Sequence, residues 1–279
     1  MKKISKEELK NILEKHEEYL SSNYERGKCA DLSYIDLSEH DLSKVNLESA
    51  NLQYADLRHA NLNCTNLSYA DLRLANLDWA DLYKADLSFA NLAGANLDYS
   101  DLQHADLYKA NLSGVSLHSA KLRRANLCEA NMNRVHLQRA YLQHADLSFA
   151  NLAGANLTYA YLKHADLYEA NLSKVNLAYA DLTCTDFSYT DLRTANLAGA
   201  NLYLTNFSHA KLSKQIIHVG PIGSRDSYTT IINEDLIICG CWSGNLEEFK
   251  KRIDETYPDG KYRQQYLAVI NLIENLRKE

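Results

Sequence analysis

The chain has 279 residues, of which 46% are hydrophobic and 24% charged, and its formal net charge is −6. This negative balance argues against direct nucleic-acid binding, no apolar run approaches the ~18 residues that span a membrane, and the N-terminus lacks the apolar stretch of a signal peptide. Six scattered cysteines are too few for a disulfide scaffold, so we expect a cytoplasmic protein that binds neither nucleic acid nor a membrane.

Residues 5–24 have the pattern of an amphipathic helix. Ser5 and Glu8 fit a capping box, and Gly27 can end the helix. Apolar or weakly polar residues recur on one helical face, at Leu9, Ile12, Leu13, His16 and Leu20. We expect residues 1–28 to form an N-terminal capping helix on the segment that follows.

Residues 29–213 are expected to form one repeat array. Every fifth residue from Leu32 to Leu212 is Leu in 34 of 37 cases, and the residue two positions earlier is Ala in 26 of 37. The residue between them is almost always Asp or Asn. The repeat is therefore A-(D/N)-L-x-x, and chance does not maintain such a pattern over this length.

A period of five fits neither an α-helix nor a flat strand, but it fits a chain that turns a corner every five residues. Four such sides close one coil, so each residue lies above the residue 20 positions earlier, and about nine coils follow. Leu then points to the axis, while Asp and Asn stabilise the turns through their side chains. We expect an all-β solenoid with an N-terminal α-helical cap and a small C-terminal αβ cap.

Three residues of the first coil are large for the small inward position, namely Ile35, His40 and Val45. They fall beneath the expected N-terminal cap. We therefore expect His40 to be buried and hydrogen-bonded to the cap. The alternative is that the His40 side chain serves as a ligand.

The run Ala55-Asp56-Leu57-Arg58-His59-Ala60-Asn61-Leu62 resembles the pentapeptide-repeat family, and the resemblance covers about two-thirds of the chain. It implies a right-handed quadrilateral β-helix. It says little about function, because the residues that carry it are the structural ones. Some family members mimic B-form DNA and bind or protect DNA gyrase, which makes gyrase an alternative partner. That mimicry requires a strongly acidic surface, whereas residues 30–212 hold 14 Lys/Arg beside 20 Asp/Glu.

The residue two positions after each Leu points outward, and these residues form four columns, one on each side of the coil. Aromatic residues and Arg, which are enriched in protein interfaces, gather in two of the columns. The candidate interaction surface consists of Trp79, Tyr99, Arg139, Tyr159, Tyr179, Phe89 and Phe149. The alternative, which we favour, is that these side chains stack between coils and only protect the corners of the helix.

Residues 214–279 depart from the repeat and are expected to form a hairpin plus two helices. The expected strands are residues 215–219, 228–233 and 236–239. The first helix is expected to begin at Asn245, with Glu248 completing a capping box, and to end near residue 257; the second runs from about residue 261 to about residue 277. This segment either caps the last coil or docks a partner, and we favour the cap.

The sequence offers no constellation for catalysis, a cofactor or a metal. Cys239 and Cys241 could supply two thiolates, but no second Cys/His pair stands at zinc-like spacing. The many Asp residues belong to the turn motif and have no phosphate loop or nucleophile beside them. We expect a non-enzymatic protein-binding or scaffold module without a cofactor, with gyrase mimicry as the alternative and an enzyme third. The sequence names neither the partner nor the oligomeric state, monomer or dimer.

Overall fold

The computed structural model describes residues 1–192, 194–202, 204–211, 217–222, 227–232, 236–239 and 242–276. The chain divides into two compact units, Met1–His136 (unit 1) and Leu137–Glu279 (unit 2), so that the division falls inside the repeat array. Domain boundaries near residues 28 and 213 stay predictions. No helix within the described segments is long and apolar enough to cross a membrane.

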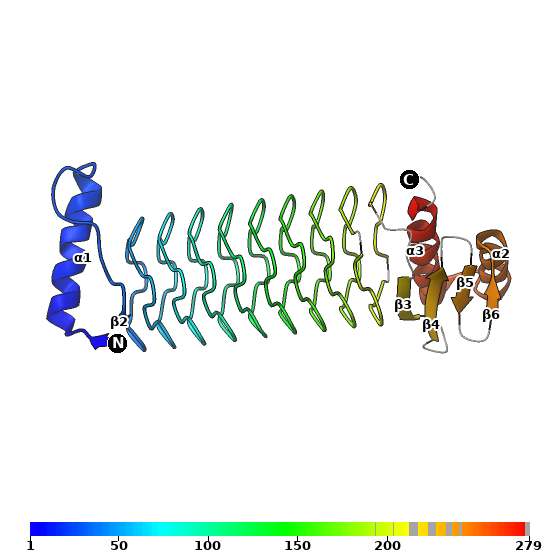
Figure 1. Cartoon of the computed structure of the whole chain (residues 1–279), viewed down its shortest axis with the longest axis horizontal. Coiled ribbons are helices and arrows are strands. Elements are labelled where there is room, and N and C mark those ends of the chain that lie inside the picture. Colours follow the sequence, from blue (N-terminus) through cyan, green and yellow to red (C-terminus); the bar gives the residue numbers. More distant parts are fainter. Residues whose placement is uncertain are drawn as a thin grey trace. The chain divides into compact units, whose positions relative to one another are not determined.

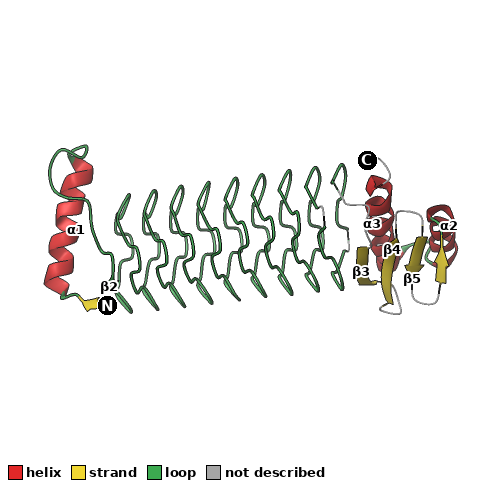
Figure 2. Cartoon of the chain, viewed as in Figure 1, coloured by secondary structure: helices red, strands yellow, loops and turns green. Residues whose placement is uncertain are grey.

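The repeats of both units form four-sided coils in which residues 20 positions apart are bridged as in a parallel sheet. The Leu32 amide, for example, donates to the Asn51 carbonyl over 2.7 Å, and the Asn51 amide donates back to the Ala30 carbonyl over 2.9 Å. The bridges are isolated, so the coils appear as loops in Figure 2 although neighbouring coils are hydrogen-bonded on every side. The predicted coil period of 20 residues is confirmed.

The leucine of each repeat lies on the axis of the coil. The described leucines at this position in both units are at most 1% exposed. The alanines two residues before them are at most 2% exposed, except for the partly exposed Ala195. In unit 2 the two axial phenylalanines, Phe187 and Phe207, are fully buried and stack on each other at 5.4 Å between ring centroids. The predicted axial core is therefore confirmed.

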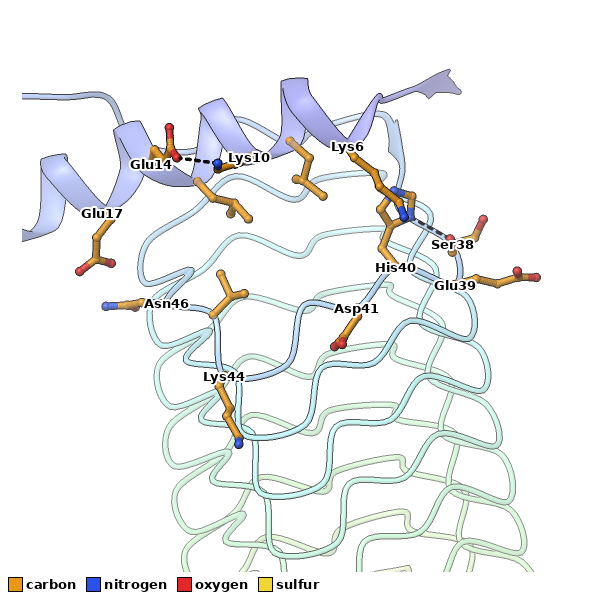
Figure 3. Close-up of a pocket in the computed structure, with 13 residues that line it drawn as sticks. Lys6, Lys10, Glu14, Glu17, Ser38, Glu39, His40, Asp41, Lys44 and Asn46 are labelled. Carbon is orange, nitrogen blue, oxygen red and sulfur yellow. Dashed lines mark hydrogen bonds and ion pairs between the residues drawn. The ribbon is translucent and has the colours of Figure 1, made fainter.

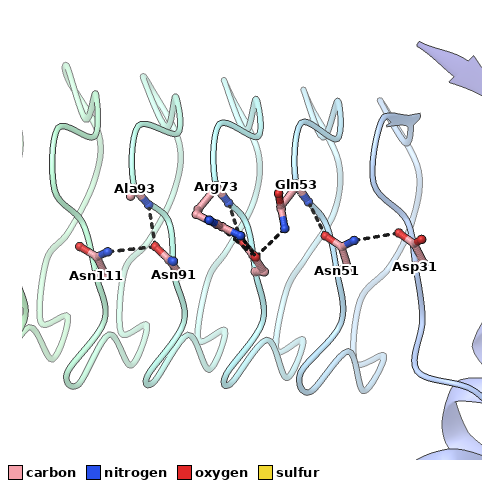
Figure 4. A network of polar contacts seen from close by, with 8 residues as sticks. Asp31, Asn51, Gln53, Arg73, Asn91, Ala93 and Asn111 are labelled. Carbon is pink, nitrogen blue, oxygen red and sulfur yellow. Dashed lines mark hydrogen bonds and ion pairs between the residues drawn. The ribbon is translucent and has the colours of Figure 1, made fainter.

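The Asp or Asn of each repeat stabilises its own turn. Its Oδ1 accepts a hydrogen bond from the amide two residues later, as Asn91 does from Ala93 over 3.2 Å. In several coils an Asn at this position also donates its side-chain amide to the coil before, as Asn111 does to Asn91 over 3.0 Å. Figure 4 shows these bonds along one side of unit 1. The Asp/Asn positions are structural, as the sequence pattern indicated.

The outward residue of each repeat has a left-handed backbone, which the sequence did not reveal. Trp79 has φ of 59° and is the third residue of a turn in which the Ala80 amide donates to the Leu77 carbonyl over 3.0 Å. A positive φ at the third residue is typical of a type II turn, where glycine is usual. Here the strain, about 1 kcal/mol or more for a bulky residue, is offset by backbone bonds on both sides, including Trp79 N–H to the Asp98 carbonyl.

Helix α1, Lys6–Ser21, begins with the predicted capping box between Ser5 and Glu8. Its Leu9 and His16 are buried. Strand β1, Lys2–Lys3, precedes the helix and pairs in parallel with β2, Ile35–Asp36, in the first coil (Figure 1). This strand was not predicted, since two lysines carry no hydrophobic alternation.

The prediction that Gly27 ends the helix is wrong. The helix ends at Ser21, and Ser22 is its C-cap. Gly27 instead lies against the side of α1, where a Cβ would come within 2.3 Å of the Lys15 carbonyl oxygen. Its φ of 75° turns the chain back, and the next residue, Lys28, donates its amide to that same carbonyl over 3.0 Å.

The prediction for His40 is wrong as well. His40 is only half-buried, and its Nδ1 lies 2.9 Å from the carbonyl oxygen of Ser38, in its own coil and not in the helix. The buried histidine is His16 of α1, whose Nδ1 accepts the Ala30 amide over 3.1 Å while Nε2 has no partner. A histidine of the helix therefore accepts a backbone amide at the start of the array that would otherwise lack a partner.

This arrangement predicts that unit 1 loses stability in mild acid. Burial lowers the pKa of His16 below its ordinary value of 6.5, and nearby Glu17 and Glu48 offset this only in part. The unfolded chain therefore binds the proton more readily than the folded one, and the His16 contribution, present above about pH 6.5, is lost as pH falls below it. Chemical denaturation of the protein between pH 7 and pH 5 measures the loss.

His16→Asn is the matched variant for this experiment. Asn keeps an acceptor near the position of Nδ1 but does not titrate, so the stability of the variant should vary less with pH over the same range. An equal pH dependence in the two proteins would contradict the role given to His16.

In unit 2 the repeats are followed by an antiparallel sheet and two helices. The sheet has the strand order β3-β4-β5-β6. The strands are β3 (Ile217–Ile222), β4 (Ser227–Ile232), β5 (Leu236–Cys239) and β6 (Trp242–Gly244), and the helices are α2 (Leu246–Thr256) and α3 (Gly260–Leu276). The predicted hairpin is thus part of a four-stranded sheet. The fourth strand, β6, was not predicted because it has only three residues. Residues 215–216 and 233, which belong to the expected strands, lie outside the described residues.

The two C-terminal helices lie close to their predicted positions. Asn245 caps α2, and Glu248 completes the predicted capping box. Phe249 of α2 packs edge-on against Tyr266 of α3, with ring centroids 5.8 Å apart. The side-chain amide of Asn275 in α3 donates to the Phe207 carbonyl, which ties this helix to a late coil of the same unit.

Candidate functional site

The outward column that carries Trp79 and Tyr99 forms a continuous ring stack on one side of unit 1. The two rings lie 4.7 Å apart at an angle of 10°, and His59 stacks on the other face of Trp79 at 6.4 Å. Trp79 is 54% exposed and Tyr99 is 41% exposed. The stacked rings therefore present their edges to solvent as a fixed ridge.

Phe89 belongs to a different column and a different side. Its ring stacks on Tyr69 at 4.8 Å and meets Tyr108 edge-on at 5.5 Å. Because positions 79 and 89 are two pentapeptides apart in a four-sided coil, they lie on opposite sides of it. The predicted surface residues of unit 1 thus form two separate aromatic stacks and cannot contact one flat partner together.

Unit 2 repeats this division. The Arg139 guanidinium lies 5.9 Å from the Tyr159 ring, which stacks on Tyr179 at 4.9 Å. Phe149, two pentapeptides from Tyr159, lies on the opposite side and meets Tyr168 edge-on at 5.5 Å. The seven predicted residues therefore all lie in ring stacks or a cation–π contact, and a role in binding stays a prediction.

Two further stacks were missed in the sequence. Tyr34 and Tyr54 stack at 4.7 Å in a column with few other aromatics. Tyr141 and Tyr161 stack at 4.9 Å at the position where Asp or Asn is usual. The second pair could have been found from the sequence, because an aromatic residue that replaces the turn-forming side chain marks an exposed departure from the repeat.

The ridge of Trp79 and Tyr99 is flanked by carboxylates. Asp98 accepts hydrogen bonds from the Ser116 hydroxyl over 2.6 Å and from the His118 amide over 2.8 Å. Asp78 has a buried Oδ1 without a hydrogen bond. Burial, reinforced by the neighbouring Asp98, raises the pKa of Asp78 above its ordinary value.

A groove of about 880 Å³ lies between α1 and the first coil. Its apolar lining comes from Leu9, Leu13 and Val45, and its charged rim contains both signs, with Lys6 and Lys10 near Glu14 in the helix and Asp41 beside Lys44 in the coil. Figure 3 shows His40 at one end of the groove, turned toward Ser38. The mixed rim favours no single charge on a ligand.

Within the part of the chain that the structure describes, no cluster of side chains could bind a metal ion and no two cysteines form a disulfide. No three His, Cys, Asp or Glu side chains there are grouped to hold a metal ion. The cysteines at 29, 64, 128, 184 and 239 are free. The pair of thiolates considered at 239 and 241 falls partly outside the described residues, since Cys241 is not among them.

A family profile for pentapeptide repeats matches the chain in eight copies. The matched segments include residues 28–63, 41–78, 75–114, 110–148, 120–158, 145–183 and 180–214. The chain belongs to the pentapeptide repeat family, and its coils are those of a right-handed quadrilateral β-helix. A search of curated protein sequences finds no match.

Solved structures of the same family resemble the chain. HetL from the cyanobacterium Nostoc sp. strain PCC 7120, a pentapeptide repeat protein involved in heterocyst differentiation regulation, is 30% identical with a TM-score of 0.58, over 77% of this chain and 97% of HetL. The pentapeptide repeat protein alr5209 from Nostoc PCC 7120 is 33% identical over 40% of this chain and 78% of its own, with a TM-score of 0.18. QnrB1, a plasmid-mediated fluoroquinolone resistance protein, is 16% identical over 64% of this chain and 89% of its own, with a TM-score of 0.29.

Proposed function

We propose that the protein is a non-enzymatic, cytoplasmic binding or scaffold protein that recognises a partner protein through its outward aromatic columns. The observation that carries this proposal is the ridge of Trp79 and Tyr99, two large side chains that remain about half exposed while fixed by stacking. Pre-ordered aromatic residues lose little conformational entropy on binding and are frequent hot spots. The resemblance to HetL, a protein involved in regulation, also favours binding over catalysis.

The competing explanation is that the rings only stabilise the corners of the coils. Affinity capture from a lysate of the source organism separates the two. The double variant Trp79→Ala/Tyr99→Ala should lose a partner that the parent protein captures, because removing a hot spot costs about 2 kcal/mol or more of binding energy. Its melting temperature should change little, since both side chains are about half exposed and lie outside the axial core.

The matched control is Tyr34→Ala/Tyr54→Ala, which removes an exposed stack of the same ring separation from another side of unit 1. It should retain the partner. If neither this pair, nor Trp79/Tyr99, nor Tyr159/Tyr179 affects capture, the columns are structural and the proposal is wrong. Inhibition or drug protection of DNA gyrase in a supercoiling assay would instead support the gyrase alternative.

We also propose that both ends of the array are capped, by α1 at the start and by the C-terminal sheet and helices at the end. An uncovered end would expose unpaired backbone and apolar axis, which favours aggregation. Two observations support the caps: His16 of α1 accepts the Ala30 amide, and Asn275 of α3 donates to the Phe207 carbonyl.

A further inference from the structure

We propose that one side of unit 1 docks an arginine- or lysine-rich segment of a partner protein. This side, the acidic aromatic face, consists of residues 36–39, 56–59, 76–79, 96–99 and 116–119, and it includes the ridge of Trp79 and Tyr99. The inference rests on the proposed function and adds the chemistry of the partner to it.

The acidic aromatic face has a surplus of carboxylates. Its residue ranges hold five acidic residues and one cation, Arg58, a difference of four negative charges. Lys3 of β1, which pairs with Asp36, offsets one more of them. The acidic residues are Asp36, Glu39, Asp56, Asp78 and Asp98. Arg58 makes its close contacts, of 2.6 Å and 2.8 Å, with Asp56, and it acts on Asp36 and Asp78 only through its charge. A cationic partner is therefore attracted to this side.

The opposite side of unit 1 is also acidic and aromatic, and its carboxylates have partners within the protein. Asp36, Asp56 and Asp98 of the acidic aromatic face have such partners too, so the two sides differ at Asp78, whose buried Oδ1 has none. Glu129 forms an ion pair with Lys109 at 3.3 Å and accepts a hydrogen bond from Tyr108 over 2.9 Å. Asp106 accepts the side-chain amide of Asn126 and the backbone amide of Tyr108. On that side these carboxylates already have partners and attract a cation less, although the aromatic rings there are exposed to a similar extent.

On the acidic aromatic face, Asp78 is the carboxylate that a cation would help most. Its Oδ1 is buried without a hydrogen bond, and Asp98 occupies the equivalent position one coil away, at a coil spacing of about 4.8 Å. Burial, and after it the negative charge of Asp98, raises the pKa of Asp78 above its ordinary value. A guanidinium or ammonium group beside the pair would remove the repulsion.

The ring edges supply the second half of the recognition. Trp79 and Tyr99 directly follow Asp78 and Asp98 in the chain, so apolar edges and carboxylates alternate along the same coils. A long cationic side chain can pack its methylene stem on the ridge while its head reaches a carboxylate. Lys and Arg combine these two features, which a short or acidic side chain lacks.

Fluorescence anisotropy with a labelled peptide of alternating arginine and glycine tests the inference on the full-length protein. The parent protein should bind this probe and not the matched glutamate–glycine peptide. Asp78→Asn/Asp98→Asn should weaken binding by about tenfold, since it removes two charges but keeps acceptors of the same shape. The same variant should also depend less on salt concentration.

Asp86→Asn/Asp106→Asn, on the opposite side, is the matched control and should bind the probe like the parent. Equal loss in both variants would show unspecific attraction to net charge, and absence of probe binding would exclude a cationic segment; either result overturns the inference. If the probe fails to bind while partner capture still depends on Trp79 and Tyr99, the proposed function stands without this refinement. If capture depends on none of the three aromatic pairs, the proposed function itself is wrong.

Discussion

Replacing Leu97 by Asp is expected to unfold the coils around it and to abolish cooperative melting of unit 1. Leu97 is fully buried on the axis, where no water or cation can reach a carboxylate. The change removes about 2 kcal/mol or more of apolar burial and adds an unpaired charge that costs several kcal/mol. Because each coil is stabilised mainly by its neighbours, the damage spreads to the adjacent coils. Circular dichroism during heating measures the loss.

Leu74→Asp is the control, because Leu74 belongs to an outward column of the same unit and is 51% exposed. The free energy of unfolding of this variant should lie within about 1 kcal/mol of that of the parent. A normal melting curve for Leu97→Asp would refute the axial assignment on which the core of both units depends.

The axial core could be predicted because the repeat determines it locally. A residue every five positions that is nearly always Leu has one consistent environment, and Ala beside it is explained by the space left in a narrow coil. The turn role of Asp and Asn followed from their own side-chain chemistry, as in Asn91. None of these inferences required knowledge of contacts distant in sequence.

The features that the sequence did not reveal depend on such contacts or on backbone geometry. His16 and His40 are both histidines near the start of the array, and only the packing of α1 shows that His16 accepts the Ala30 amide while His40 faces a groove. The left-handed φ at positions such as Trp79 is invisible because these positions tolerate nearly any residue. The carboxylate pair of Asp78 and Asp98 likewise appears only when residues 20 positions apart are stacked.

The sequence predicted which residues belong to the candidate surface but not how they are arranged on the sides of the coil. Columns follow directly from the period of 20, so the membership of Trp79 with Tyr99 and of Tyr159 with Tyr179 was available in advance. The separation of Phe89 from Trp79 onto opposite sides was also implicit in the four-sided coil, yet the seven residues were grouped as one surface. Ring distances and the state of the neighbouring carboxylates then distinguish the two sides of unit 1.

Gly27→Ala is expected to destabilise the attachment of α1 to the chain that returns from it. An added Cβ would lie 2.3 Å from the Lys15 carbonyl oxygen and 2.6 Å from the Tyr19 amide nitrogen, and both are backbone atoms of a helix that cannot move independently. The φ of 75° adds the cost of a left-handed alanine. Together these effects should lower the stability of unit 1 by about 3 kcal/mol.

Gly114→Ala separates the clash from the backbone cost. Gly114 has a φ of 65°, but an added Cβ would meet no atom within 4 Å, and bulky residues occupy the equivalent position in most other repeats. This control should lose about 1 kcal/mol or less. Hydrogen exchange of α1 and of the Lys28 amide, which donates to Lys15, is the informative measurement, because Gly27→Ala should accelerate both while leaving the axial coils protected. Unchanged exchange in α1 would mean that the return segment does not hold the helix, and that strand β1 and His16 attach it alone.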